Sequence, residues 1–90
     1  MTYFVYILFS EKDKNLYAGC TSNVEKRLGR HNAGRVPATK NRTPLTLIHQ
    51  EKFESKADAF ERERFLKSLW ASRLKKKLKQ EYLDKVGRSI

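Results

Sequence analysis

Two short runs determine the fold that this sequence predicts: FVYIL at residues 4–8 and LYAG at residues 16–19. Both are rich in β-branched and aromatic residues, which favour strands. The first belongs to a continuous apolar stretch, Tyr3–Phe9, so both of its faces look buried and we expect a central strand. A polar connection over residues 10–15 predicts an antiparallel hairpin, in which Tyr6 and Tyr17 lie near each other.

The middle of the chain predicts a helix, a loop and a third strand. The TSN segment at residues 21–23 offers N-caps, and Gly34 offers a stop, for a helix over residues 24–33. Residues 35–44 contain two prolines and several cations, so we expect a cationic surface loop. A strand is expected over Leu45–Phe53, with Leu45, Leu47 and His49 on one face.

The last third of the chain predicts two helices. Residues 55–58 have the spacing of a capping box, and the helix that follows is expected to run to about Leu69 or Trp70. A final basic helix is expected over about residues 71–86. Three apolar or aromatic residues spaced four apart would pack this helix against the rest of the domain: Leu74, Leu78 and Tyr82.

Size and composition exclude several classes of protein. Ninety residues, 39% of them hydrophobic, predict one folded domain over residues 1–90. The longest apolar run has seven residues, whereas a membrane-spanning helix needs about 20. No secretory signal is expected at the N-terminus. Cys20 is the only cysteine, which excludes an intrachain disulfide and a cysteine-based zinc site. We therefore expect a cytoplasmic protein.

The charge predicts a polyanionic partner. Twenty Lys and Arg residues oppose ten Asp and Glu residues, which gives a net charge of +10. Nucleic acid is the usual partner for such a balance, while a merely solvated surface and an acidic membrane are the alternatives. The candidate phosphate contacts lie in the loop and in the final helix: Arg35, Lys40, Arg42, Lys75, Lys76, Lys77 and Lys79.

Glu63 is the most distinctive polar residue. On a helical projection it falls in the middle of an apolar stripe formed by Ala59, Phe60, Leu66 and Trp70. A carboxylate on a buried face is costly unless it is paired or binds a metal. The two interpretations are a metal or catalytic site and a structural ion pair with Lys67, one turn further on.

Arg27 and His31 lie four residues apart and share a helix face. A guanidinium can clamp phosphate oxygens and an imidazole can move protons near neutral pH, although both could also be ordinary surface residues. Taken alone, Tyr6 and Tyr17 are more typical of core or sheet tyrosines than of catalysts. A phenol has a pKa near 10, so a tyrosine that acts as a base needs help from a cation.

Taken in order, these segments resemble the GIY-YIG nuclease domain. The resemblance rests on VYI at residues 5–7, YAG at residues 17–19, Arg27, and Glu63 within RERFLKS at residues 62–68. It covers about residues 3–70, and the segments at residues 16–32 and 39–44 are similar to those of small single-domain bacterial members. Cys20 stands where many relatives carry a lysine.

The resemblance implies a fold of the broad α/β class, of the α+β type. Its architecture would be a small three-stranded antiparallel sheet flanked by helices. It also implies that Glu63 binds one divalent metal, Mg²⁺ or Mn²⁺. Tyr17 would lie near the attacking water as its base, Tyr6 would orient water and phosphate, and Arg27 would stabilise the phosphoryl charge. His31 would also line the site, and it is the alternative candidate for the base.

The sequence thus predicts a metal-dependent endonuclease that hydrolyses a DNA phosphodiester in repair or processing. One alternative is a DNA- or RNA-binding module that has kept the fold without the chemistry. Another is a subunit that needs a partner to act. The sequence leaves the substrate structure and the oligomeric state open.

Overall fold

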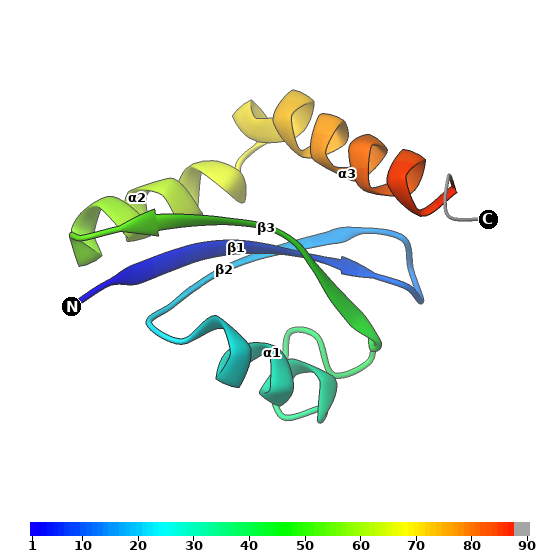
Figure 1. Cartoon of the computed structure of the whole chain (residues 1–90), viewed down its shortest axis with the longest axis horizontal. Helices are drawn as coiled ribbons and strands as arrows, with labels where there is room; N and C mark the ends of the chain where they lie inside the picture. Colours follow the sequence, from blue (N-terminus) through cyan, green and yellow to red (C-terminus); the bar gives the residue numbers. More distant parts are fainter. Residues whose placement is uncertain (88–90) are drawn as a thin grey trace.

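The structure is a computed structural model that describes residues 1–87. Its elements follow in the order β1 (Tyr3–Ser10), β2 (Leu16–Thr21), α1 (Val24–Asn32), β3 (Leu45–Phe53), α2 (Lys56–Leu66), the 3₁₀ turn η1 (Leu69–Ala71) and α3 (Ser72–Gly87). The three strands form an antiparallel sheet in the order β2-β1-β3, which confirms the predicted fold. Helix α1 covers one face of the sheet, and α2 and α3 lie on the other (Figure 1).

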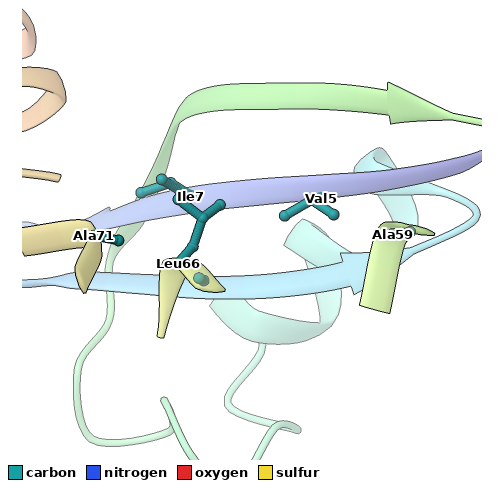
Figure 2. Close-up of a cluster of buried hydrophobic side chains, with 6 residues drawn as sticks. Val5, Ile7, Ala59, Leu66 and Ala71 are labelled. Carbon is teal, nitrogen blue, oxygen red and sulfur yellow. The ribbon is translucent and has the colours of Figure 1, made fainter. Parts of the chain in front are cut away.

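Strand β1 is buried on both faces, as its continuous apolar sequence predicts. Val5 and Ile7 pack with Ala59, Leu66 and Ala71 in the layer between the sheet and α2 (Figure 2). The alternate β1 residues point to the other face, because successive strand side chains alternate. There Tyr6 and Leu8 form a smaller cluster with Leu45 of β3, supported by Tyr17, Leu28 and Leu47.

Helix α2 ends at Leu66, earlier than predicted. The backbone N–H of Lys67 still bonds to the carbonyl of Glu63, but Ser68 is extended and its hydroxyl donates to the carbonyl of Phe65. The chain then turns through η1. The predicted stripe of apolar residues around Glu63 is therefore wrong in part, because Trp70 lies beyond the helix and is 88% exposed.

The other residues of the predicted stripe are also partly buried and partly exposed. Ala59 and Leu66 are fully buried against the sheet, whereas Phe60 is 46% exposed. Glu63 is half-buried, with 22% of its side chain exposed. It lies at the border of the buried face and not at its centre, and this position keeps its carboxylate accessible.

A β-bulge in β3 overturns one prediction. Ile7 pairs with His49 and Leu8 pairs with Leu47, so Ile48 is an extra residue between them. An extra residue reverses the alternation of side chains from that point on. His49 therefore does not share a face with Leu45 and Leu47. It lies on the face of α2, where it bonds to Glu51 at 2.8 Å.

The loop between α1 and β3 is cationic but also anchored. Val36 and Thr39 are buried within it. The Asn32 side chain donates to the carbonyl of Leu45 and accepts from its N–H, at 2.9 and 2.7 Å. Satisfying a backbone donor and acceptor with one amide fixes where β3 begins relative to α1.

Helix α3 packs against the sheet as its spacing predicts. Leu74 and Leu78 contact the larger core cluster. Tyr82 packs against the ring of Phe9, with 5.0 Å between ring centres, and its hydroxyl donates to Glu11 at 2.9 Å. Among residues 1–87 no helix is both long and apolar enough to cross a lipid bilayer.

Gly19 allows the ring of Tyr6 to reach the β2 edge of the sheet. The two residues are paired across β1 and β2, and a Cβ on residue 19 would collide with Oη and Cζ of Tyr6. Gly29 on α1 has no heavy atom within 4 Å of the position of such a Cβ. The two glycines therefore form a matched pair for substitution.

We predict opposite effects of alanine at these two positions. Gly19→Ala should lower the free energy of unfolding by about 1–3 kcal/mol, because the ring of Tyr6 must move. Gly29→Ala should raise it by about 0.5–1 kcal/mol, because alanine loses less backbone entropy in a helix and meets nothing. Urea denaturation of both variants checks this; equal changes would show that the Tyr6 ring is not held against residue 19.

Candidate active site

His31 lies at the centre of a buried hydrogen-bonded chain. It is fully buried on the inner face of α1. Its Nε2 is 2.9 Å from Oη of Tyr6, and its Nδ1 is 2.6 Å from Oγ1 of Thr39. A neutral imidazole satisfies both contacts, with one nitrogen donating and the other accepting. The surface interpretation of His31 is therefore wrong.

Both motif tyrosines contact the His31 ring. The ring centre of Tyr6 is 5.9 Å from that of His31, and the ring centre of Tyr17 is 5.3 Å from it, both edge-on. Tyr6 is buried in the central strand, while Tyr17 is half-buried in the edge strand β2. The prediction that the two tyrosines lie near each other is thus supported through a shared neighbour.

Arg27 supplies the positive charge of this cluster. Its Nε is buried and has no hydrogen-bond partner among the described residues. Burial and the nearby Arg27 guanidinium lower the pKa of His31 to about 4. Burial raises the pKa of Tyr6, and Arg27 acts in the opposite direction. At neutral pH, Arg27 is therefore the cation of the cluster and His31 is neutral.

Glu63 approaches the cluster from the other face of the sheet. Its Oε2 lies 3.2 Å from Nζ of Lys67, and the same Nζ lies 5.2 Å from the ring centre of Tyr17. Glu63 is also close enough to contribute, after burial, to the raised pKa values of Tyr6 and Cys20. The contacts thus run from Glu63 through Lys67, Tyr17 and His31 to Tyr6.

These residues meet at the β2 edge of the sheet. Helix α1 brings Arg27 and His31 to one face, and α2 brings Glu63 to the other (Figure 1). An edge strand has no neighbour on its outer side, so a substrate can approach it from there. The five residues predicted for the site, Tyr6, Tyr17, Arg27, His31 and Glu63, are therefore neighbours in the fold.

A divalent metal would have one protein carboxylate here. Among residues 1–87, no three His, Cys, Asp or Glu residues are grouped as a metal site. Mg²⁺ is often bound by only one or two carboxylates, with water and substrate phosphate completing its shell. Glu63 fits that pattern, since it opens onto a hollow shared with Phe60, Arg64 and Lys67. Lys67 would have to give up its contact with Glu63.

The predicted phosphate contacts divide into free and engaged cations. Arg35, Lys40 and Lys77 are exposed. Arg42 instead donates to Asp13 at 2.6 Å and to the carbonyl of Leu16 at 3.3 Å, and this contact lowers the pKa of Asp13 to about 2. Arg42 thus ties the loop to the β1–β2 turn, and a phosphate would have to compete with Asp13.

Three lysines of α3 extend the site along β2. Lys75, Lys76 and Lys79 line a hollow with Asn15 and Leu16 at the start of that strand. Lys75 also lines the adjoining hollow beside Tyr17 and Lys67. A line of ammonium groups beside an open strand suits a phosphodiester backbone.

Sequence reasoning missed two members of the site. Thr39 fixes the His31 ring, but it lies in a loop where no periodicity marks a buried residue. The sequence indicates Lys67 only as a partner of Glu63, and its position over Tyr17 depends on where α2 ends. Gly19 was recognisable as a motif residue, but its contact with Tyr6 was not.

Comparisons with known proteins find a matching family model and several similar proteins. Residues 2–80 match the family model described as the GIY-YIG catalytic domain. A UPF0213 protein of Natronomonas pharaonis is 48% identical over 75 residues, which cover 82% of this chain and 85% of that protein. A UPF0213 protein of Bacillus velezensis is 37% identical over 89 residues, covering 98% and 84% of the two chains.

A solved structure is also similar. The solution NMR structure of the UPF0213 protein BH0048 from Bacillus halodurans has a TM-score of 0.52 and 31% sequence identity. The match covers 82% of this chain and 81% of that one. The two proteins therefore share the fold over most of their lengths.

We predict that His31 makes stability depend on pH. Its pKa is about 4 in the folded state against 6.5 for the free side chain, so the unfolded chain binds the extra proton first. Stability should fall as pH drops below 6.5, by about 2 kcal/mol between pH 7 and pH 5. Urea denaturation across this range measures the loss.

The two histidines of the chain provide the control. His31→Gln should remove the pH-dependent loss, whereas His49→Gln should keep it. An NMR titration of the His49→Gln variant observes the His31 ring alone, and a midpoint near 6.5 would show that His31 is not buried as the structure has it.

Proposed function

This chain belongs to the GIY-YIG family, and on that premise we propose that it is a metal-dependent endonuclease that hydrolyses DNA phosphodiesters in repair or processing. The observation that carries the proposal is the continuous series of contacts from Glu63 to Tyr6 around the open edge of β2. The series joins a carboxylate, two phenols, an imidazole and cations. Such groups can hold a metal ion, orient or deprotonate water, and neutralise the charge on a phosphoryl group.

A divalent ion, Mg²⁺ or Mn²⁺, held by Glu63 would supply Lewis-acid polarisation of the phosphate. Arg27 neutralises the charge that develops on the phosphoryl oxygens, an electrostatic contribution that is usually large in catalysis. Tyr6 orients water and phosphate. Its hydrogen bond to His31 fixes the phenol, and the lack of a side chain at Gly19 leaves room for the ring. These roles follow the family resemblance, and the positions of the side chains support them.

Tyr17 is the better candidate for the general base. His31 has a pKa of about 4 and both ring nitrogens are engaged, so it is a weak base at neutral pH. Tyr17 lies at the rim, with the Lys67 ammonium over its ring. Lys67 thus provides the nearby cation that many relatives place at the position of Cys20. His31 acts as a positioning residue for Tyr6.

The non-catalytic alternative rests on a specific contact. Glu63 is paired with Lys67, and it belongs to no group of three or more His, Cys, Asp or Glu residues within the described part of the chain. A DNA- or RNA-binding module could keep the lysines of α3 and dispense with the metal. Metal-dependent cleavage that is lost with Glu63 distinguishes the two functions.

We predict that Glu63→Gln abolishes cleavage but not binding. The amide keeps the shape of the side chain and removes the charge that holds the metal. The pair with Lys67 is partly exposed, so its loss should change the free energy of unfolding by less than about 1 kcal/mol. Nicking of supercoiled DNA over a range of Mg²⁺ and Mn²⁺ concentrations, with a filter-binding assay beside it, measures both properties.

Glu61→Gln is the matched control, because Glu61 lies on the same helix and is exposed. It should leave cleavage unchanged. Cleavage that survives Glu63→Gln would contradict the metal assignment and favour the binding module.

We also predict that Arg27 matters far more than Arg30. Arg27 is half-buried beside Tyr6 and His31, while Arg30 is exposed on the same helix. Arg27→Ala should lower the cleavage rate by about 10²–10³-fold, by analogy with the loss of one oxyanion-stabilising donor. Arg30→Ala should weaken DNA binding slightly and leave the rate at saturating DNA unchanged. Equal rate losses would mean that both act only through general charge.

A further inference from the structure

The turn after α2 exposes two large apolar side chains. Leu69 is 91% exposed and Trp70 is 88% exposed. Burying a side chain of this size would normally stabilise a protein by a few kcal/mol, so such exposure in a small domain calls for an explanation. The candidate site described above does not include either residue.

The turn is held in place rather than loose. Leu66 before it and Ala71 after it are fully buried in the core. The hydroxyl of Ser68 donates to the carbonyl of Phe65 at 2.6 Å, and the N–H of Ala71 donates to the carbonyl of Ser68 at 3.3 Å. The hydroxyl of Ser72 closes the turn on the carbonyl of Leu69. The indole is therefore presented to solvent on a fixed support.

The surroundings of the turn are strongly cationic. Residues 64–80 contain no Asp or Glu. They contain seven cations: Arg64, Lys67, Arg73, Lys75, Lys76, Lys77 and Lys79. Charge complementarity favours an anionic occupant, and the exposed indole favours one that also carries a flat or apolar group.

A nucleic acid meets both requirements better than a membrane does. Membrane-surface helices bury a broad apolar face in the lipid, but Leu74 and Leu78 of α3 are turned into the protein core. Leu83 and Val86 of that helix are less than half exposed, whereas Leu69 and Trp70 at the tip are almost fully exposed. Nucleobases, by contrast, stack on single aromatic side chains beside a phosphate-binding groove.

The turn also lies close to the candidate site. Lys67 contacts both Glu63 and the ring of Tyr17, and Trp70 is three residues further along the chain. Three residues span at most about 11 Å. At about 3.4 Å per nucleotide along a duplex strand, that distance corresponds to at most about three nucleotides.

From this geometry we infer that Trp70 is a base-stacking residue, which receives an unstacked nucleobase within about three nucleotides of the phosphate at the β2 edge. The inference rests on the proposed function for the class of substrate. The surrounding lysines and Arg73 contact the phosphates on either side. Leu69 supplies an apolar flank beside the indole.

The single tryptophan of the chain makes this directly measurable. Metal-free protein is titrated with oligothymidylate and with an abasic oligomer of the same length and charge. Stacking should quench the Trp70 fluorescence only with the base-bearing oligomer, and that oligomer should bind about 10–100-fold more tightly than the abasic one. Equal binding without quenching would overturn the inference.

Variants separate stacking from charge. With a labelled oligothymidylate, Trp70→Ala should raise the Kd about 10–100-fold, while Trp70→Phe should recover most of the affinity. Leu83→Ala removes another exposed apolar side chain, on the later part of α3, and should change nothing. Because Trp70 is solvent-exposed, its replacement should not unfold the protein. A Kd unaffected by Trp70→Ala would overturn the inference.

Two further outcomes keep the inference distinct from the proposed function. Fluorescence that responds to phosphatidylglycerol vesicles but not to oligothymidylate would overturn base stacking and indicate a membrane surface. Base-dependent quenching by a protein that cuts no DNA would support stacking and refute the nuclease. Cleavage that persists without base-dependent binding would refute stacking and support the nuclease.

Discussion

The site depends on the buried hydrogen bond between Tyr6 and His31. Tyr6 belongs to the central strand, His31 to α1, and Thr39, on the other ring nitrogen, to the loop before β3. One imidazole thus fixes three segments that are distant in the sequence. Because the ring is buried and neutral, it can serve as a rigid polar support, and Gly19 provides the space that lets the phenol of Tyr6 reach it from the strand.

This arrangement explains how a thin sheet can assemble a site from both of its faces. The groups from α1 and from α2 would be separated by the sheet if they met over its middle. At β2 no further strand intervenes, and Tyr17 contacts His31 on one side and Lys67 on the other. The edge position therefore brings the carboxylate of Glu63 within electrostatic range of Tyr6.

Much of the fold, and the fact that the five candidate residues are neighbours in it, could be predicted from the sequence, because apolar periodicity and motif order indicate both. The strands and α1 depend on local patterns, so the sequence predicts them. The sequence does not predict the end of α2, because the Ser68 hydroxyl and the buried Ala71 stop the helix where the residue pattern continues. The bulge at Ile48 likewise depends on pairing with β1, which a single strand cannot reveal. The contact of Thr39 with His31 could not be predicted either, because it depends on how the loop after α1 folds back against that helix.

The early end of α2 has a consequence for the charge of the site. Lys67 is therefore the C-cap residue of α2, and its ammonium group contacts both the Glu63 carboxylate and the Tyr17 ring. Without substrate this pair is neutral and partly exposed, so holding it costs little. Binding of a divalent ion at Glu63 would release the ammonium just as a phosphodiester brings new negative charge beside it. Metal and nucleic acid would then favour each other's binding, since each relieves the charge that the other leaves unpaired.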